Sequence, residues 1–333
     1  MSSYKIVFLV SEHQEDPVEV RTELIETELR GLDYELTTHR CSSKDDAISA
    51  ARYADIVLDL GVPISRDVIG ALEKAQAIIC QAHGFDHVDI EAASEKGILV
   101  INSAGYCADE VVVHTMALLL ACARRIPQFH ELVRTGRWDT TTRSDALRLP
   151  TVYGQTLGII GLGNIGRMVA RRAQGFDMNV IAFDPFMQPW IAAENKVALT
   201  ESLDNLAERS DYVIVIVPSA EGTSNMITSD FFRMMKSSAY FINVSRGSTV
   251  DEEALIEALR AGRICGAALD VFQTEPTPID NPLLQMDNVV LSPHTAGTSD
   301  ASASKGQTRL GQEAARIIRG ERPMSPVNSQ FSS

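Results

Sequence analysis

The chain has 333 residues, of which 45% are hydrophobic and 22% are charged, as in a folded globular protein with a sizeable core. Because a domain typically holds about 150 residues, we expect about two domains. The formal net charge of −14 provides no general attraction for a nucleic-acid backbone or an anionic lipid surface, so neither partner is expected.

The N-terminal residues lead directly into a short apolar run at residues 6–10, without the basic stretch and cleavage site of a signal peptide. The longest apolar run, residues 111–123, contains His114 and Thr115 and is too short to span a bilayer. We therefore expect a cytoplasmic protein. The five cysteines are scattered and odd in number, which favours reduced thiols.

Through the first third of the chain, short β-rich apolar runs alternate with helical patterns. The expected strands are residues 6–10, 56–60, 77–80 and 98–101, and the expected helices are residues 18–30, 67–73 and 90–95. Such alternation is the signature of a parallel sheet covered by helices.

A long helical pattern follows at residues 110–126, apolar on nearly every side until Arg124 and Arg125. Such a helix must be buried on most faces, in a core or against another subunit. Residues 138–153 are polar and rich in threonine, with Pro150 and Gly154 as turn signals, and we expect a connecting arm there.

A second alternating series begins at Thr156. Its expected strands are residues 157–160, 180–183, 213–217, 240–244 and 266–269, and its expected helices are residues 165–174, 203–208, 230–235 and 251–260. One more helix follows, with an apolar face that should pack on a neighbouring domain; the face comprises Leu310, Ala314, Ile317 and Ile318. The expected fold class is α/β, with two doubly wound parallel-sheet domains and an interdomain cleft.

A glycine-rich turn follows the first strand of the second series and opens a helix; it reads Gly161-Leu162-Gly163-Asn164-Ile165-Gly166. In that context the pattern predicts a dinucleotide-binding site, although an accidental glycine pattern is the alternative. Gly161 permits a tight turn, Gly163 lets the backbone approach a pyrophosphate and Gly166 lets the helix pack on the strand. The helix N-terminus, including Asn164 and Ile165, then faces the phosphates.

The next strand ends in Asp184, at the distance where an acid accepts hydrogen bonds from the adenosine ribose. No Arg or Lys follows directly in Pro185-Phe186-Met187, and a carboxylate would repel the 2′-phosphate of NADP. We therefore expect NAD as the cofactor, with a solvated acid at a strand end as the alternative interpretation of Asp184. We also assign to the cofactor site residues at or after the ends of later strands, namely Val217, Pro218, Val244 and Gly297.

Three further segments each follow an expected strand and carry an ionisable residue: Arg246, Glu275 and His294. Ligands of open α/β sheets bind beyond the carboxyl ends of the strands. Arg246 offers a planar fork of donors for a carboxylate, and His294 can exchange a proton near neutral pH. Glu275 would orient the imidazole and favour its charged form. Taken singly, each residue could equally be an ordinary surface or turn residue.

Together these motifs resemble the D-isomer-specific 2-hydroxyacid dehydrogenase family. The resemblance rests on the glycine turn, Ser245-Arg246-Gly247 with residues 250–255, Leu269-Asp270-Val271-Phe272 with Glu275-Pro276, and Ser292-Pro293-His294-Thr295-Ala296-Gly297. It covers nearly the whole chain and has the motifs in the right order. It implies an NAD-dependent dehydrogenase that moves a hydride between the cofactor and C2 of a small 2-hydroxy or 2-oxo acid.

The resemblance also implies roles and domains. Arg246, Glu275 and His294 would form the catalytic triad, and Asp270 would lie by the nicotinamide carboxamide. Residues 82–89 resemble the family's substrate loop, whose N–H groups, here at His83 and Gly84, hold the substrate carboxylate. Residues 1–102 and 297–333 would form a discontinuous flavodoxin-like substrate domain. Residues 103–296 would form a Rossmann NAD-binding domain that includes the dimerisation helix and arm of a homodimer.

The chain departs from the family pattern at three positions, with Ala82 in place of a usual glycine, Ala104 in place of a common proline and Val113 in place of an acid. Residues 105–111 are closest to the branch that includes C-terminal binding protein and its bacterial enzyme relatives. His83 could add a donor for a second polar group of the substrate, or could contribute its N–H alone.

Two other functions stay open. An NAD(H)-sensing interaction protein, like the corepressors of that branch, would keep the same three residues. A dehydrogenase of a small anion such as formate or phosphite would use a related fold, although pairing of His294 with Glu275 is typical of hydroxy-acid enzymes. No metal is expected, because the nearest ligand spacing, His83 and His87, lies in a predicted loop.

Overall fold

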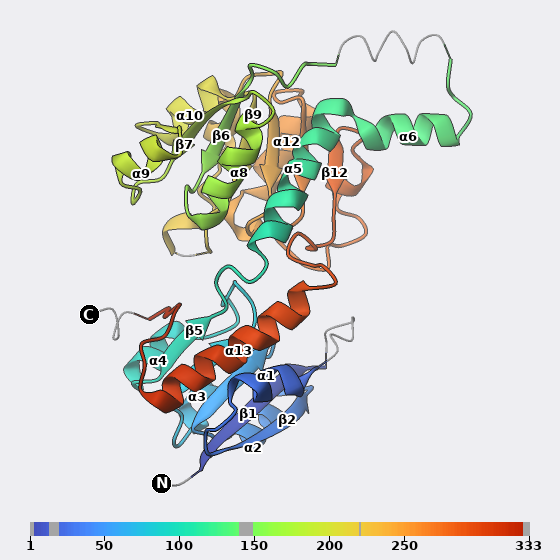
Figure 1. The fold of residues 1–333 in the computed structure, drawn as a ribbon. Coiled ribbons are helices and arrows are strands. Elements are labelled where there is room, and N and C mark those ends of the chain that lie inside the picture. The colour runs from blue at the N-terminus through green and yellow to red at the C-terminus, as the bar shows by residue number, and fades with distance from the viewer. Residues whose placement is uncertain (1–2, 13–19, 140–148, 220, 329–333) are drawn as a thin grey trace. The chain divides into compact units, whose positions relative to one another are not determined.

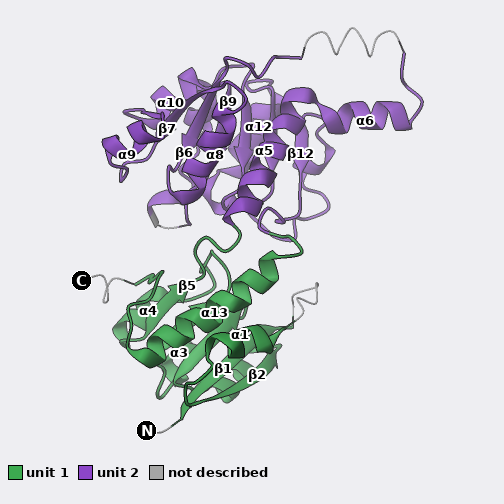
Figure 2. Cartoon of the chain, viewed as in Figure 1, with its two compact units in different colours: residues 1–107, 298–333 green, residues 108–297 purple. Residues whose placement is uncertain are grey.

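Parallel β-sheets form the centre of the computed structural model, which describes residues 3–12, 20–139, 149–219 and 221–328. Unit 1 comprises Met1–Cys107 and Thr298–Ser333, and unit 2 comprises Ala108–Gly297 (Figure 2). The sequence analysis places the first boundary after residue 102, where the structure places it after Cys107. The α/β class with two doubly wound parallel sheets is confirmed.

Unit 1 has a parallel sheet in the order β2-β1-β3-β4-β5 (Figure 1), which is the flavodoxin-like order. Its strands are β1 (Tyr4–Ser11), β2 (Tyr34–Cys41), β3 (Ile56–Leu60), β4 (Ala77–Cys80) and β5 (Leu99–Asn102). Its helices are α1 (Thr22–Glu28), α2 (Lys44–Ala51), α3 (Arg66–Ala71), α4 (Ile90–Glu95) and α13 (Ser302–Arg319).

Helices cover both faces of this sheet, so its central strands are mostly apolar and buried. Successive strand residues point to opposite faces. Ile56 and Leu58 of β3 join a core cluster with α1 and α13, whereas Val57 joins the cluster with α2, α3 and α4. Leu310 and Ala314 of α13 are fully buried in the first cluster, so a segment from the far end of the chain completes unit 1.

The sequence analysis does not predict β2 or α2. Strand β2 is an edge strand whose residues are mostly exposed, so it lacks the apolar alternation of a half-buried strand. Helix α2 has a readable start, because Ser43 and Asp46 form a reciprocal capping box. The expected helix at residues 18–30 is found as α1, and residues 18 and 19 lie outside the described residues.

Unit 2 has a parallel sheet in the order β12-β11-β10-β9-β6-β7-β8, a Rossmann arrangement extended by β12. Its strands are β6 (Thr156–Ile160), β7 (Asn179–Phe183), β8 (Ala198–Leu199), β9 (Tyr212–Val215), β10 (Tyr240–Asn243), β11 (Gly266–Leu269) and β12 (Val289–Leu291). Its helices are α5 (Ala108–Arg124), α6 (Ile126–Arg134), α8 (Asn164–Gln174), α9 (Pro189–Glu194), α10 (Leu203–Arg209), α11 (Ser229–Met234) and α12 (Glu252–Arg260).

Helix α5 is buried along one side and exposed along the other. Val112 and Leu119 pack in a cluster with Val169 of α8, whereas the side chain of Val113 is 62% exposed. Burial of the remaining side would require another subunit, and that part of the expectation stays a prediction. Helix α6 was not predicted and has no buried residue; residues 140–148 of the expected arm lie outside the described residues.

Within the described residues, no helix combines the length and the hydropathy that a membrane crossing requires.

Candidate active site

The glycine-rich turn joins β6 to α8, and its geometry fits a bound dinucleotide. Gly161 has φ +94°, and a Cβ there would collide with the carbonyl oxygen of Ile216. A Cβ at Gly166 would collide with the carbonyl oxygen of Gly161, so a side chain at Gly166 would push the helix away from the turn. No atom lies within 4 Å of a Cβ built on Gly163, which leaves open space at the helix N-terminus for a phosphate.

Asp184 is tied to this turn by hydrogen bonds. Its Oδ2 accepts from the N–H of Leu162 at 2.8 Å, and its Oδ1 accepts from the N–H of Phe186 at 3.0 Å. The acid is thus held at the end of β7 beside the glycine turn, where its remaining lone pairs can accept from ribose hydroxyls. This placement argues against a freely solvated strand-end acid.

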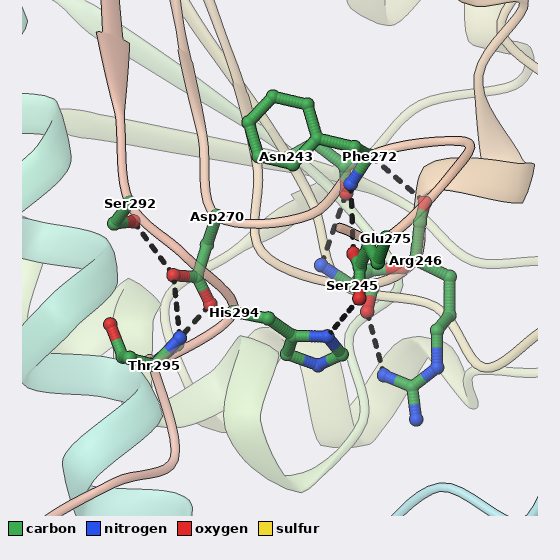
Figure 3. A network of polar contacts seen from close by, with 10 residues as sticks. Asn243, Ser245, Arg246, Asp270, Phe272, Glu275, Ser292, His294 and Thr295 are labelled. Atoms are coloured by element: carbon green, nitrogen blue, oxygen red, sulfur yellow. Dashed lines mark hydrogen bonds and ion pairs between the residues drawn. The ribbon is translucent and has the colours of Figure 1, made fainter. Parts of the chain in front are cut away.

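His294 and Glu275 meet directly, since His294 Nδ1 lies 2.6 Å from Glu275 Oε2 (Figure 3). The second carboxylate oxygen, Oε1, accepts from the N–H of Phe272 at 2.9 Å. The two side chains are 46% and 35% exposed, respectively. Nδ1 of the imidazole is therefore occupied by Glu275, and Nε2 at the opposite edge of the ring is the nitrogen that can contact a ligand.

The carboxylate of Glu275 is kept ionised by its partners. Partial burial acts to raise its pKa, but hydrogen bonds from His294 and from the Phe272 N–H, with the charges of His294 and Arg246, hold the pKa below its ordinary value of 4.5. An ionised carboxylate against Nδ1 stabilises the protonated imidazole.

Arg246 follows β10, and its backbone is fixed by two donors to its carbonyl oxygen, Asn243 Nδ2 at 2.9 Å and Thr249 Oγ1 at 2.7 Å. Its guanidinium donates to the Ser245 carbonyl at 2.8 Å and lies in one cluster with Glu275 and His294 (Figure 3). Gly247 makes this approach possible, because a Cβ there would collide with the backbone of Phe272.

Asp270 is fully buried beneath the loop that carries His294. Its Oδ1 accepts from Ser292 Oγ at 2.7 Å and from the Thr295 N–H at 3.0 Å, and its Oδ2 accepts from the Ala296 N–H at 2.9 Å (Figure 3). Its carbonyl oxygen accepts from the His294 N–H at 2.7 Å. His294 has φ +52°, a left-handed conformation that is unfavourable for a residue with a Cβ and persists only when the surroundings hold it.

The other residues assigned to the cofactor site occupy different environments. Val217 is half-buried beside Gly161, and its carbonyl accepts from Ser245 Oγ at 2.7 Å. Pro218 is exposed, Val244 is 8% exposed within the core, and Gly297 is half-buried at the end of unit 2.

His83 and Gly84 belong to unit 1. The carbonyl of His83 accepts from Asn102 Nδ2 at 2.6 Å, and its Nδ1 accepts from the Gly105 N–H at 3.4 Å. His87 lies with Asp59 and Cys80, and the ligand-type atoms of the three all fall within 4.8 Å of one another.

This trio of Asp59, Cys80 and His87 is explained without a metal ion. His87 Nε2 lies 2.5 Å from Asp59 Oδ2. Burial, followed by the charge of Asp59 and a hydrogen bond to it, raises the pKa of the Cys80 thiol well above its ordinary value. Imidazole and thiol thus both act as donors to one buried carboxylate.

Sequence reasoning missed His114 of α5, whose Nε2 lies 2.9 Å from Ser292 Oγ. The available signal was a lone histidine interrupting an otherwise apolar helix.

The chain is similar to known proteins along most of its length. Residues 116–296 match the model of the D-isomer specific 2-hydroxyacid dehydrogenase NAD binding domain. A D-3-phosphoglycerate dehydrogenase of Methanocaldococcus jannaschii is 38% identical over 86% of this chain, although the match spans only 54% of that relative. A glyoxylate reductase of Korarchaeum cryptofilum is 38% identical, over 86% of this chain and 87% of its own length.

A solved structure gives the same result. The NADPH-dependent glyoxylate/hydroxypyruvate reductase of Sinorhizobium meliloti, in complex with NADP and malonate, is 27% identical with a TM-score of 0.82, over 98% of this chain and 97% of that one. The present chain is thus an NAD-dependent oxidoreductase of 2-hydroxy acids. It belongs to the D-isomer specific 2-hydroxyacid dehydrogenase family.

Proposed function

We propose that this enzyme reduces the C2 carbonyl of a small 2-oxo acid and oxidises the corresponding D-2-hydroxy acid in reverse. The contact of His294 with Glu275, in one cluster with Arg246, is the observation that carries the proposal. Bound NADH supplies the hydride. The protein must then bind the acid, orient it and exchange one proton with the substrate oxygen.

His294 is the proton donor in reduction and the proton acceptor in oxidation. Because Nδ1 is occupied by Glu275, the proton passes through Nε2. The ionised Glu275 keeps the ring oriented and stabilises its protonated form. In oxidation Nε2 accepts the hydroxyl proton, and the carboxylate of Glu275 balances the positive charge that forms on the imidazole.

Arg246 binds the substrate carboxylate. A guanidinium presents donors in a planar fork that matches a carboxylate in a way that a lysine ammonium does not. The hydrogen bonds to its carbonyl oxygen and to that of Ser245 restrain the backbone and side chain. This restraint reduces the entropy lost when the substrate binds.

The cofactor is NAD in preference to NADP. Asp184 is held against the glycine turn through Leu162, so its negative charge lies where a 2′-phosphate would have to bind. The Sinorhizobium meliloti relative uses NADPH by its name, and the preference of this chain therefore rests on Asp184 itself.

We further propose that the N–H groups of His83 and Gly84 contribute to binding of the substrate carboxylate. If the His83 side chain also contacts the substrate, His83→Ala will raise KM for a dicarboxylic or sulfonated 2-oxo acid more than for pyruvate. An unchanged ratio of the two KM values would remove the side chain from the site and leave only its backbone.

We propose a homodimer formed through α5, α6 and the arm. The surface there is rich in exposed apolar side chains, which a monomer would leave in water; they include Val113, Ile126, Val133, Trp138 and Tyr153. Light scattering after size-exclusion chromatography tests this proposal, and a single species of 36.4 kDa would refute it.

The substrate is tested by following NADH absorbance with a panel of 2-oxo acids that contains glyoxylate, hydroxypyruvate, pyruvate, phenylpyruvate and sulfopyruvate. At least one small acid should turn over with NADH, and Arg246→Ala should raise its KM and cut kcat/KM by about 100-fold or more. Arg233→Ala, a change to an exposed arginine that pairs with Asp230 on α11, is the control. Absence of turnover with every acid, in either direction, would contradict the proposal.

A further inference from the structure

Helix α5 brings one histidine to the buried carboxylate beneath the active-site loop. His114 Nε2 lies 2.9 Å from Ser292 Oγ and 3.3 Å from Asp270 Oδ1. Ser292 Oγ lies in turn 2.7 Å from Asp270 Oδ1. These three side chains come from α5, from the end of β12 and from the end of β11, so the triangle joins three separate segments of unit 2.

The direction of each hydrogen bond in this triangle follows from the chemistry of the groups. A carboxylate can only accept, so Ser292 must use its single hydroxyl proton on Asp270. The contact between Ser292 and His114 then requires an N–H at Nε2 of His114. His114 is thus a donor to the Ser292 oxygen, with Asp270 Oδ1 within reach of the same N–H.

Asp270 transmits this arrangement to His294. Its two carboxylate oxygens accept from the N–H groups of Thr295 and Ala296, and its carbonyl accepts from the N–H of His294. Donors thus converge from α5 on one side and from the loop on the other. Asp270 thus holds the left-handed backbone of His294, φ +52°, through the N–H of His294 itself and through the two N–H groups that follow it.

We propose that His114 is a positioning residue for His294, acting through Ser292 and Asp270. The N–H of His114 orients the Ser292 hydroxyl, which donates to the buried carboxylate. The carboxylate in turn keeps the loop in the conformation that presents the imidazole to Glu275. The catalytic part of this inference rests on the proposed role of His294. The structural part, restraint of the Thr295 and Ala296 amides, does not.

Two readouts separate those parts. In His114→Leu, amide hydrogen exchange of the peptide that contains Thr295 and Ala296 should become at least about 10-fold faster in the enzyme without ligand, because Ser292 loses the donor that orients its hydroxyl toward Asp270. Turnover should fall by about 10- to 100-fold, as expected when a reacting group is misplaced.

Rescue by matched variants gives the inference its specificity. His114→Gln retains an N–H donor and should restore slow exchange and most of the turnover, and Ser292→Thr should behave like wild type where Ser292→Ala behaves like His114→Leu. His39→Leu, at an exposed histidine of β2, is the control. Should His114→Leu fail to fold, the Ser292 pair tests the same relay.

Wild-type exchange and wild-type kcat in both His114→Leu and Ser292→Ala would overturn the inference. Faster exchange with unchanged kcat would also overturn it, because the loop would then be restrained without consequence for the chemistry. Failure of the proposed function would give a different result. His294→Asn would then keep normal turnover, regardless of the amide exchange rates of Thr295 and Ala296.

Discussion

Replacement of Glu275 by glutamine tests the proton chemistry with almost no change of shape. In Glu275→Gln the amide oxygen can keep the hydrogen bond from the Phe272 N–H, which places the amide NH2 against His294 Nδ1. That donor opposes a proton on Nδ1 and therefore opposes the doubly protonated imidazole that reduction requires. The change removes one charge and reverses one hydrogen bond.

The magnitude follows from the exposure of the pair. A hydrogen bond to a charged group is worth about 1.5–3 kcal/mol, and side chains that are 46% and 35% exposed fall at the lower end because water screens them. About 1.5 kcal/mol corresponds to about tenfold in rate. The kcat of reduction at neutral pH should therefore fall by about 10- to 100-fold.

The assay is initial NADH consumption between pH 5 and 10, with NADH affinity measured separately by fluorescence. Gln273→Glu, an exposed change two residues away, controls for a general effect of charge. A Glu275→Gln profile that overlies the wild-type profile, at wild-type kcat, would refute the reasoning about Nδ1.

The depressed pKa of Glu275 also predicts how stability depends on acid. Because the folded-state pKa lies below the ordinary value of 4.5, the unfolded chain binds the proton more readily than the folded one does. The contribution of Glu275 to stability is thus fully present above pH 4.5 and is lost as the pH falls through its folded-state pKa. Chemical denaturation at pH 6 and pH 4 should show a smaller acid-induced loss in Glu275→Gln than in wild type, and an equal loss would contradict the assignment.

Three further predictions concern the cofactor site and unit 1. Asp184→Ser should lower kcat/KM for NADH and raise it for NADPH, changing their ratio by about 10-fold or more, because it removes the charge opposed to a 2′-phosphate; a constant ratio measured with both cofactors would contradict this. Gly166→Val should abolish NADH binding in a fluorescence titration, because its side chain collides with the Gly161 carbonyl, and retained affinity would count against the turn as the binding site. His87→Ala should lower the free energy of unfolding by about 2–3 kcal/mol, since it removes a donor from the buried Asp59; an unchanged denaturation midpoint would show the pair to be unimportant.

The strands that could be predicted from the sequence are those buried on both faces of a sheet. Strands β3, β4, β6 and β9 are mostly apolar on both faces because helices cover both, so their hydrophobic runs are visible in the sequence. Strand β2 is exposed at the sheet edge, and it is recognised as a strand only from its parallel pairing with β1. Helix α6 has no buried residue in this chain, so burial within the chain could not have indicated it.

The candidate site divides in the same way. Arg246, Glu275 and His294 follow strands whose carboxyl ends share one edge of a parallel sheet, so their convergence follows from strand order. The contact of His114 with Asp270 depends on which side of α5 faces the end of β11, and that is set by packing of α5 against α8. The close passage of Gly247 over the Phe272 backbone is likewise set by a distant segment, because Gly247 only begins a short 3-10 turn and has no positive φ that would itself require glycine.

The central claim, that His294 exchanges the substrate proton, is tested most directly by single-turnover NADH oxidation in His294→Ala saturated with NADH and the best 2-oxo acid. The account predicts that NADH binds with near-normal affinity while the rate of the single turnover falls by about 100- to 10,000-fold. A single-turnover rate close to that of the wild type would contradict it.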